Sequence, residues 1–307
     1  MKVGLIIVFG SINIDLVFSV SRLPLEGETV IGPGYAMFHG GKGANQAVAA
    51  ARYGARVEMV GAVGRDDFGC AALEALRGDG VGVGAVRRLD APTGCAAIGL
   101  DTEGRNQIMV ASGANALVSA DMVPDELLDR AGVVLAQMEI PSEADWEFLR
   151  RARNSGAVTV FNAAPAGVLP EEALPFIDVL IVNEPECIAA AAAAGVDGRD
   201  AHACASGLAA CCGIDVITTL GARGAALCRP DGKRLHVEGA AISPVDSTGA
   251  GDTFCGVLAA CLDGGLALAE AIRRANAAGA LSCLQRGARG GMPSALEVER
   301  MLAGDVH

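Results

Sequence analysis

Short apolar runs alternate along this chain with segments of helical character, and this alternation constrains the fold more than any other feature. The strand-like runs lie at residues 57–63, 133–137, 158–161, 179–182 and 216–220, and helix-like segments follow at 67–77, 143–153 and 186–194. Strands joined through helices pair in parallel, because each helix returns the chain to the same end of the sheet. The sequence therefore predicts an α/β fold, a parallel sheet with helices on both faces.

Two regions interrupt this alternation. Residues of about 11–39 and 86–110 contain short strand-like pieces and turn signals but almost no helical pattern. We expect them to form a small separate β-sheet that acts as a lid beside a ligand site. From residue 249 onward the chain is mostly helical, at 249–262, 268–285 and 295–302. We find no repeat or linker that would divide the chain, so we expect residues 1–307 to form one domain.

Charge and composition limit the partners that this chain can have. The sequence carries 24 Lys and Arg against 36 Asp and Glu, a formal net charge of −12. This charge argues against nucleic acid as a partner, because phosphate backbones are bound chiefly by Lys and Arg. We also expect no membrane partner, because no apolar stretch approaches the roughly 18 residues of a membrane span. The ten cysteines form no Cys-x-x-Cys pair and are expected to be small buried residues in a reducing cytoplasm.

Three glycine-containing segments are candidate ligand sites. Residues 40–46 open a helix, where glycines either let the backbone approach a ligand or simply allow tight packing. Residues 219–224 follow a strand, so they form either a ligand loop at the carboxyl end of the sheet or a plain turn. Residues 249–251, Gly-Ala-Gly, open another helix and present free backbone N–H groups to an anion. Asp252, in the same first turn, either complements the helix dipole or accepts the proton of an attacking hydroxyl.

Taken together, these segments resemble the ribokinase-type carbohydrate kinases of the PfkB family over essentially the whole chain. Two blocks carry most of the resemblance, residues 40–69 and residues 246–254 with the sequence Asp-Ser-Thr-Gly-Ala-Gly-Asp-Thr-Phe. Shorter similar pieces lie at 10–15, 113–116, 137–141 and 183–186. The resemblance implies an α/β body with a small β lid that also clasps a second copy in a homodimer. It further implies transfer of the ATP γ-phosphoryl group to the 5-hydroxyl of D-ribose.

The resemblance also assigns roles to individual residues. Asp252 would be the general base. The sugar would be bound by Asn13, Asp15, Gly41, Lys42, Gly43, Asn45, Glu139 and Asp252. ATP would be bound by Asn183, Thr219, Leu220, Gly221, Ala222, Arg223, Gly224, Gly249, Ala250, Gly251, Asp252 and Asn276. Carboxylates such as Asp15 and Glu139 suit a sugar site, because they accept hydrogen bonds from vicinal hydroxyls and penalise an epimer that cannot donate.

Two kinds of metal ion are implied as well. Mg²⁺ would bridge the phosphates of ATP near Asn183 and offset their charge. A monovalent activator, K⁺, would bind at Asp246, Thr248, Ser282, Gln285, Gly287 and Gly291. Gln285 and Gly291 depart from the family pattern, which has Arg and Ser there. Activation by K⁺ therefore depends on whether backbone carbonyls alone supply those contacts.

Two alternatives to a ribose kinase stay open. A related kinase of the same family would act on 2-deoxyribose, a ketohexose or a nucleoside, which a comparison of acceptors separates. A protein of the same fold could also bind sugar without catalysis, since fold does not fix function. The second alternative is less favoured, because Asp252 and the Gly-Ala-Gly segment are both present.

Overall fold

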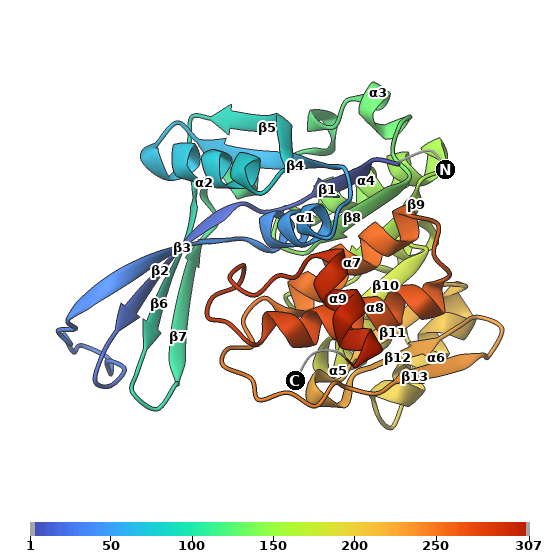
Figure 1. Cartoon of the computed structure of the whole chain (residues 1–307). Coiled ribbons are helices and arrows are strands. Elements are labelled where there is room, and N and C mark those ends of the chain that lie inside the picture. The colour runs from blue at the N-terminus through green and yellow to red at the C-terminus, as the bar shows by residue number, and fades with distance from the viewer. Residues whose placement is uncertain (1–3, 305–307) are drawn as a thin grey trace.

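A nine-stranded sheet forms the centre of the molecule. The structure is a computed structural model that describes residues 4–304, and the strand order in this sheet is β13-β12-β11-β10-β9-β8-β1-β4-β5. The strands from β11 to β5 run parallel, and β12 and β13 add an antiparallel edge. Their bounds are β1 (Ile6–Phe9), β4 (Val57–Gly64), β5 (Gly82–Leu89), β8 (Val133–Gln137), β9 (Val158–Asn162), β10 (Val179–Asn183), β11 (Asp215–Thr219), β12 (Ala225–Cys228) and β13 (Arg234–Val237). The predicted α/β fold with a mainly parallel sheet is confirmed (Figure 1).

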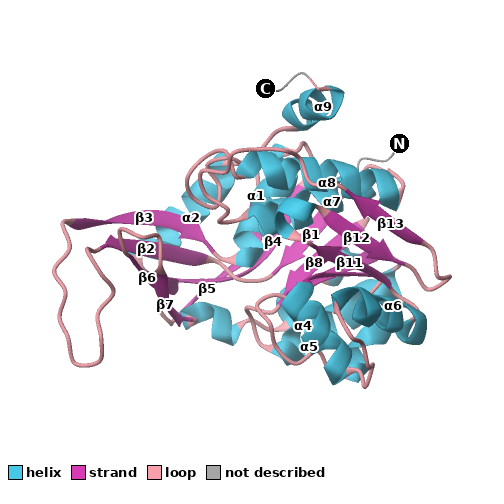
Figure 2. Cartoon of the chain, turned by 90° about the horizontal axis from the view of Figure 1, so that it is seen from below, coloured by secondary structure: helices cyan, strands magenta, loops and turns pink. Residues whose placement is uncertain are grey.

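Helices cover both faces of this sheet (Figure 2). One face carries α1 (Lys42–Arg52), α2 (Asp67–Gly78), α7 (Ala250–Asp263) and α8 (Leu268–Ser282), with α9 (Ala295–Ala303) packed on α8. The other face carries α3 (Asp125–Leu128), α4 (Ser142–Ser155), α5 (Glu184–Ala193) and α6 (Ala201–Cys212). Short 3₁₀ helices lie at Gly113–Leu117, Ala120–Met122, Glu171–Phe176 and Gly221–Arg223.

Strand β1 shows why the two layers form. Ile6 and Val8 pack into the core with α1 and α7, whereas Ile7 and Phe9 pack into the core with α4. Alternate side chains of a strand point to opposite faces, so an unbroken apolar strand needs cover on both sides. None of the helices within residues 4–304 is both long and apolar enough to cross a bilayer.

A second, four-stranded sheet projects from the body (Figure 1). Its order is β3-β2-β6-β7, with bounds β2 (Asn13–Ser19), β3 (Gly34–Gly40), β6 (Gly94–Leu100) and β7 (Asn106–Ala111). The small separate sheet predicted from the sequence is therefore present. We call it the lid sheet.

Some predicted boundaries are wrong. Residues 86–89, which we expected in the lid, belong to β5 at the edge of the large sheet. Side chains of β5 pack against both body cores, Val83 and Val86 on one side and Ala85 and Leu89 on the other, which explains its place there. The helix expected to reach Gln285 ends at Ser282. Cys70 and Cys211 are exposed, and Cys95, Cys212 and Cys283 are only partly buried, contrary to the expectation that the cysteines are buried.

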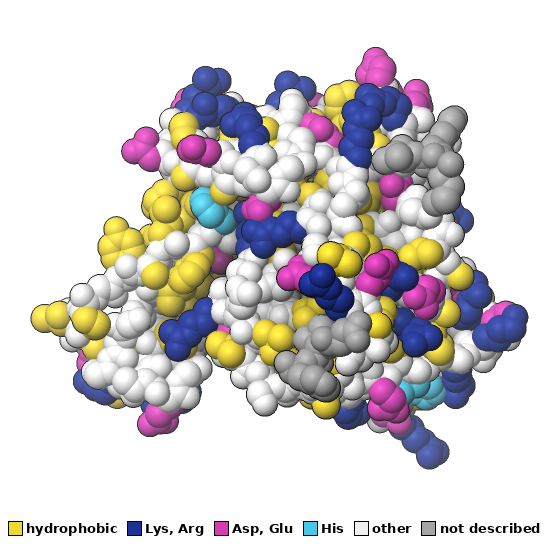
Figure 3. Space-filling view, in the orientation of Figure 1, with side chains coloured by type: hydrophobic (Ala, Val, Ile, Leu, Met, Phe, Trp, Pro, Cys, Tyr) yellow, Lys and Arg dark blue, Asp and Glu magenta, His cyan; other side chains and the backbone are white. Residues whose placement is uncertain are grey.

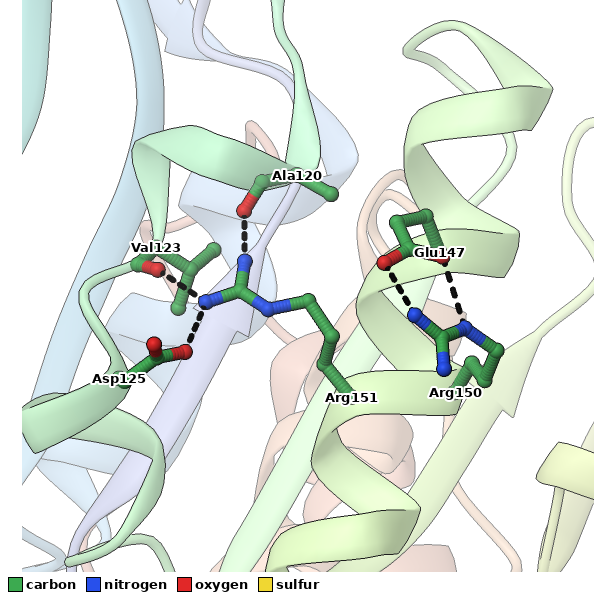
Figure 4. Close-up of polar contacts among 6 residues, drawn as sticks. All are labelled: Ala120, Val123, Asp125, Glu147, Arg150 and Arg151. Carbon is green, nitrogen blue, oxygen red and sulfur yellow. Dashed lines mark hydrogen bonds and ion pairs between the residues drawn. The ribbon is translucent and has the colours of Figure 1, made fainter.

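Arg151 of α4 shows how one layer is tied together (Figure 4). Its guanidinium donates to the carbonyl oxygens of Ala120 and Val123 and to the carboxylate of Asp125. These bonds fasten the segment before α3 onto α4. The neighbouring Arg150 instead pairs with Glu147, three residues earlier on the exposed side of the same helix. The charges in this region hold the fold together and lie outside the candidate site.

Candidate active site

Three carboxylates from distant parts of the chain meet at one edge of the large sheet. Asp15 lies in β2, Glu139 follows β8, and Asp252 lies in the first turn of α7. They converge because parallel strands all end at the same edge of the sheet. Burial and the nearby Glu139 raise the pKa of Asp15 to about 6, with Arg289 opposing and Asp252 adding to the rise. The three acidic groups therefore share one electrostatic environment.

The glycines of residues 40–43 make this convergence possible. Gly41 precedes α1 with φ of +86°, and a side chain there would come within 2.7 Å of the backbone nitrogen of Asn13. A side chain on Gly43 would lie 2.7 Å from the backbone of Gly10, and one on Gly40 would collide with the carboxylate of Asp15. The cluster lets α1 begin directly against the junction of β1 and β2.

Glu139 is held at the start of α1 by two donors. The Ser11 hydroxyl donates to Glu139 Oε2 at 2.5 Å, and the backbone N–H of Lys42 donates to the same oxygen at 3.0 Å. Burial alone would lower the pKa of the Lys42 ammonium, but the nearby carboxylates of Asp252, Glu139 and Glu186 raise it above its usual value. Lys42 is therefore a cation among these acids.

Asp252 is buried, and its carboxylate accepts hydrogen bonds from two side-chain amides. Asn45 Nδ2 donates to its Oδ2 at 3.1 Å, and Gln46 Nε2 donates to its Oδ1 at 3.0 Å. Burial raises the pKa of Asp252, the Lys42 charge and these two amides oppose the rise, and Glu139 adds to it. A buried carboxylate with a raised pKa and fixed orientation is suited to accept a proton from a hydroxyl.

The first turn of α7 offers an anion site next to Asp252. Gly249 has φ of +78°, and a side chain there would approach the backbone of Ala288 to 2.5 Å, so glycine is required at this turn. The N–H of Ala250 bonds to the Ser247 carbonyl, while those of Gly251 and Asp252 have no acceptor among the described residues. Free N–H groups at a helix N-terminus favour a phosphoryl group.

A cavity of about 620 Å³ opens at this same turn. Its walls come from the end of β11, the loop at 239–247, the first turn of α7 and the middle of α8. Of the residues predicted to bind ATP, it is lined by Thr219, Gly221, Ala222, Gly224, Ala250, Gly251 and Asn276. A cavity of this size accommodates a nucleoside. Gly251 lies on its wall and directly precedes Asp252, so the cavity meets the acidic site at α7.

Two segments, residues 245–248 before α7 and residues 282–291 at the end of α8, contain the six residues predicted to hold a monovalent cation. Asp246 accepts from the N–H of Thr248 and of Gly287, each at 2.9 Å. Burial would raise the pKa of Asp246, but these donors and the Arg286 charge hold it below its usual value. Gly291 packs so tightly on the Ser282 carbonyl that a side chain would collide with it. Gln285 is exposed.

Comparison with known proteins shows the family to which this chain belongs. Residues 3–295 match the family described as pfkB family carbohydrate kinase. The chain belongs to the pfkB family. It is 35% identical over 301 residues to the ribokinase of Haemophilus influenzae, covering 96% of this chain and 97% of that protein. The resemblance inferred from the sequence is thereby confirmed.

Solved structures of pfkB-family kinases resemble this one closely. The ribokinase of Thermotoga maritima superposes with a TM-score of 0.92 at 33% identity, over 98% of this chain and 99% of that chain. The ribokinase of Arabidopsis thaliana complexed with ribose and ATP gives 0.88 at 32% identity, with the same coverage.

Some predicted residues of the pfkB-family site have structural roles as well. Asn183 caps α5, because its Oδ1 accepts from the Glu186 N–H at 2.8 Å while Glu186 Oε2 accepts from the Asn183 N–H. Asn276 donates to the Glu238 carbonyl at 2.9 Å. Leu220 and Arg223 are not among the residues lining the cavity, and Arg223 pairs with Glu184 on the surface. Contacts of these residues with ATP stay predictions.

Four residues of the site were missed from the sequence. Ser11 and Gln46 lie inside the segments that carried the resemblance, so their positions were visible although their roles were not. Asn162 ends a buried strand, β9, and its Oδ1 accepts from Gln46 Nε2 at 3.0 Å. Arg289 lies in the loop between α8 and α9, where no local pattern distinguishes it from a surface residue.

Proposed function

We propose that this protein transfers the γ-phosphoryl group of ATP to the 5-hydroxyl of D-ribose, giving D-ribose 5-phosphate and ADP. The observation that carries the proposal is the position of Asp252. It lies at the N-terminus of α7, between the carboxylates of Asp15 and Glu139 and the nucleoside-sized cavity. Relatives named as ribokinases, and one such structure that contains ribose and ATP, support the choice of substrates.

The sugar would lie against Asp15 and Glu139, which accept hydrogen bonds from its hydroxyls. Asn13, Lys42 and Asn45 would add donors. Asn45 uses one amide hydrogen for Asp252 and retains a second for the sugar. An acceptor lacking a matching hydroxyl leaves a buried carboxylate unpaired, which gives such a site its selectivity.

Asp252 would act as the general base. As the 5-oxygen attacks the γ-phosphorus, the 5-hydroxyl proton passes to the Asp252 carboxylate and ADP departs with the electrons of the broken P–O bond. The free N–H groups of Gly251 and Asp252 and the dipole of α7 would stabilise charge on the transferred group. Lys42 would contribute positive charge from the acceptor side.

A magnesium ion would bind beside this centre. Glu186 is buried, and burial raises its pKa while the Asn183 N–H and the charge of Lys42 lower it, so Glu186 shares the electrostatic environment of Lys42. Glu186 and Asn183 offer the oxygen atoms that Mg²⁺ prefers. When bound with ATP, the ion would neutralise phosphate charge.

The loops at 246–248 and 282–291 would hold a monovalent cation through backbone carbonyls and Asp246. Gly291 has no side chain to contribute, and its tight contact with the Ser282 carbonyl leaves no room for one. We therefore expect carbonyl ligands to suffice and K⁺ to activate the enzyme. Equal rates in potassium and choline salts at matched ionic strength would contradict this.

We also propose that residues 1–307 act as one cytoplasmic kinase domain whose lid sheet pairs two copies. All ten cysteines are free thiols, which suits a reducing compartment. The lid sheet exposes large apolar side chains, among them Tyr35, Ile108, Met109 and Val110. Figure 3 shows apolar side chains gathered over this sheet, at the left of the molecule. Apolar surface of this kind is typical of a protein contact.

A panel of acceptors tests the proposed function. ADP formation is measured with Mg²⁺, K⁺ and ATP, and kcat/KM is compared for D-ribose, 2-deoxyribose, fructose and adenosine. We expect D-ribose to give the highest value. A different leading acceptor would make this a sister kinase, whereas sugar binding without ADP formation from any acceptor would favour a sugar-binding protein.

A further inference from the structure

Arg289 reaches from the loop between α8 and α9 into the acceptor side of the site. Its Nε donates to Asn45 Oδ1 at 2.9 Å, and its Nη2 donates to the Gly40 carbonyl at 3.2 Å. The third guanidinium nitrogen, Nη1, is buried and has no hydrogen-bond partner among residues 4–304. Arg289 thus approaches both the glycine cluster and the amide that holds Asp252.

These bonds decide which end of the Asn45 amide faces Asp252. A guanidinium has donors and no acceptor, so it accepts only the oxygen end of an amide as its partner. With Oδ1 turned to Arg289, Nδ2 must face the Asp252 carboxylate, as observed at 3.1 Å. If the amide were reversed, two oxygens would face each other at Asp252 and two donors at Arg289.

Arg289 also brings positive charge to the carboxylates. Its charge lowers the pKa of Asp15 against the effects of burial and Glu139. Burial lowers the pKa of Arg289 to about 10, with Arg52 adding to this effect and Asp79, Asp15 and Asp252 opposing it, so the side chain stays protonated at neutral pH.

Other charged groups share this environment. Around the carboxylates they are Lys42 from α1 and Glu139 from the end of β8. Around the guanidinium they are Arg52 from α1, Asp79 after α2, and His39 of β3. Arg52 and Asp79 already pair with each other at 2.6 Å, which leaves Arg289 directed toward the acceptor site.

We propose that Arg289 is a positioning residue for the catalytic base. It fixes the amide of Asn45, and Asn45 in turn orients the Asp252 carboxylate toward the acceptor hydroxyl. The role rests on the proposed function in one respect, that Asp252 removes the acceptor proton.

Substitutions at Arg289 test this role against a merely structural one. Arg289→Met removes the donors and the charge at similar length, and Arg289→Lys restores one donor and the charge. We expect Arg289→Met to lower kcat at least about tenfold, with KM for ATP nearly unchanged. We also expect it to shift the acidic limb of the pH profile of kcat/KM to higher pH. Arg289→Lys should recover most of both effects. Arg300→Met, an exposed arginine on α9, is the matched control and should behave as wild type.

A double-mutant cycle shows whether Arg289 acts through Asn45. Asn45→Ala should lower kcat, and adding Arg289→Met to it should lower kcat by less than about twofold more, because the amide to be positioned is already gone. Fully additive losses of kcat would show that Arg289 does not act through Asn45. A wild-type kcat and pH profile in Arg289→Met would overturn any role in catalysis.

Two further outcomes can be distinguished from a failure of the proposal: a variant that does not fold, and an enzyme that prefers another acceptor. If Arg289→Met does not fold, Arg289→Gln leaves a polar group in the buried position. Its side chain is uncharged and shorter than that of arginine, so it is expected to hold Asn45 poorly and to show a similar loss of kcat, and wild-type kinetics in that variant would contradict the proposal. If the wild-type enzyme prefers another acceptor to ribose, the assays are run with that acceptor. The substrate assignment would then fail while the role of Arg289 is still tested.

Discussion

Asp15, Glu139 and Asp252 place three acidic side chains at the point where a polyanion would react. Lys42 and Arg289 bring positive charge to this cluster. The phosphate groups themselves would face backbone N–H groups of α7 in place of a patch of Lys and Arg. A net charge of −12 therefore opposes nucleic acid binding without opposing nucleotide binding.

The pH dependence of catalysis should follow the carboxylates. Burial and the nearby Glu139 raise the pKa of Asp15 to about 6, and burial raises the pKa of Asp252 above its usual value. In the proposed mechanism both side chains act as carboxylates, so lowering the pH would protonate them and remove activity. We predict that kcat/KM for ribose is steady in mildly alkaline solution and falls as pH decreases through about 6. Rates measured across this range in buffers of equal potassium concentration check it, and a profile flat to pH about 4.5 would contradict it.

Asp145 carries a stability prediction. It is buried in α4, both carboxylate oxygens lack a partner among the described residues, and burial raises its pKa well above the usual value. Between the unfolded and folded pKa values the folded state binds the extra proton, so stability is lost as pH rises. Asp145→Asn should therefore raise Tm by a few degrees in alkaline solution and by less in acid.

A neighbouring position on α4 provides the control for this prediction. Glu143 is exposed on the same helix, and Glu143→Gln should leave Tm nearly unchanged at both pH values. Equal Tm shifts for Asp145→Asn in acid and alkali would show that the carboxyl group is not kept protonated by burial.

Among the helices and strands, the first turn of α7 is the element that we expect to bind the phosphate groups of ATP. A methyl group at Gly251 would meet no protein atom within 4 Å, and Gly251 lies on the wall of the nucleoside-sized cavity. Gly251→Ala should therefore preserve Tm while the methyl group obstructs the phosphate-binding turn. We predict a fall of at least about tenfold in kcat/KM for ATP.

The other end of the same helix supplies the comparison. At Gly264 a methyl group would make ordinary contacts at 3.4 Å on an exposed surface, so Gly264→Ala should retain full activity. If Gly251→Ala were as active as Gly264→Ala, the first turn of α7 would not be the phosphate site.

The elements that the sequence revealed are those with a strong local pattern. Buried strands such as β8 and β10 consist mainly of Val, Leu and Ile, and their predicted bounds agree within a residue. Helix α6 was not predicted, because its alanines and cysteines give no apolar stripe, and the short β12 and β13 resemble a loop. Helix boundaries near residue 283 depend on tertiary contacts that no local pattern reports.

Some residues of the site also have a local signal in the sequence, and others do not. Asp252 and the glycine cluster could be picked out as candidates, because a helix start and close backbone approach each leave a mark in the sequence, but their proposed roles came from the family resemblance. The bond between Arg289 and Asn45 joins residues 244 positions apart, and neither segment alone indicates it. Pairings of this kind depend on the folded topology.

At the scale of the whole molecule, the lid sheet is expected to join two copies. Ile108 and Met109 are neighbours on β7, both exposed, and successive side chains of a strand point to opposite faces. We predict that the wild-type protein sediments as a dimer and that Ile108→Asp or Met109→Asp, whichever lies on the contacting face, yields a monomer. The other variant serves as the control. A monomeric wild type, or dimers in both variants, would rule out the lid contact.

In the proposed function, this fold assembles a ribose kinase around Asp252. The most direct test is ribose-dependent formation of ADP and ribose 5-phosphate by wild type and by Asp252→Asn, with ATP binding measured on both. We expect the substitution to lower kcat by about two to four orders of magnitude while the Kd for ATP changes little. An Asp252→Asn enzyme that turns over ribose at near the wild-type rate would contradict it.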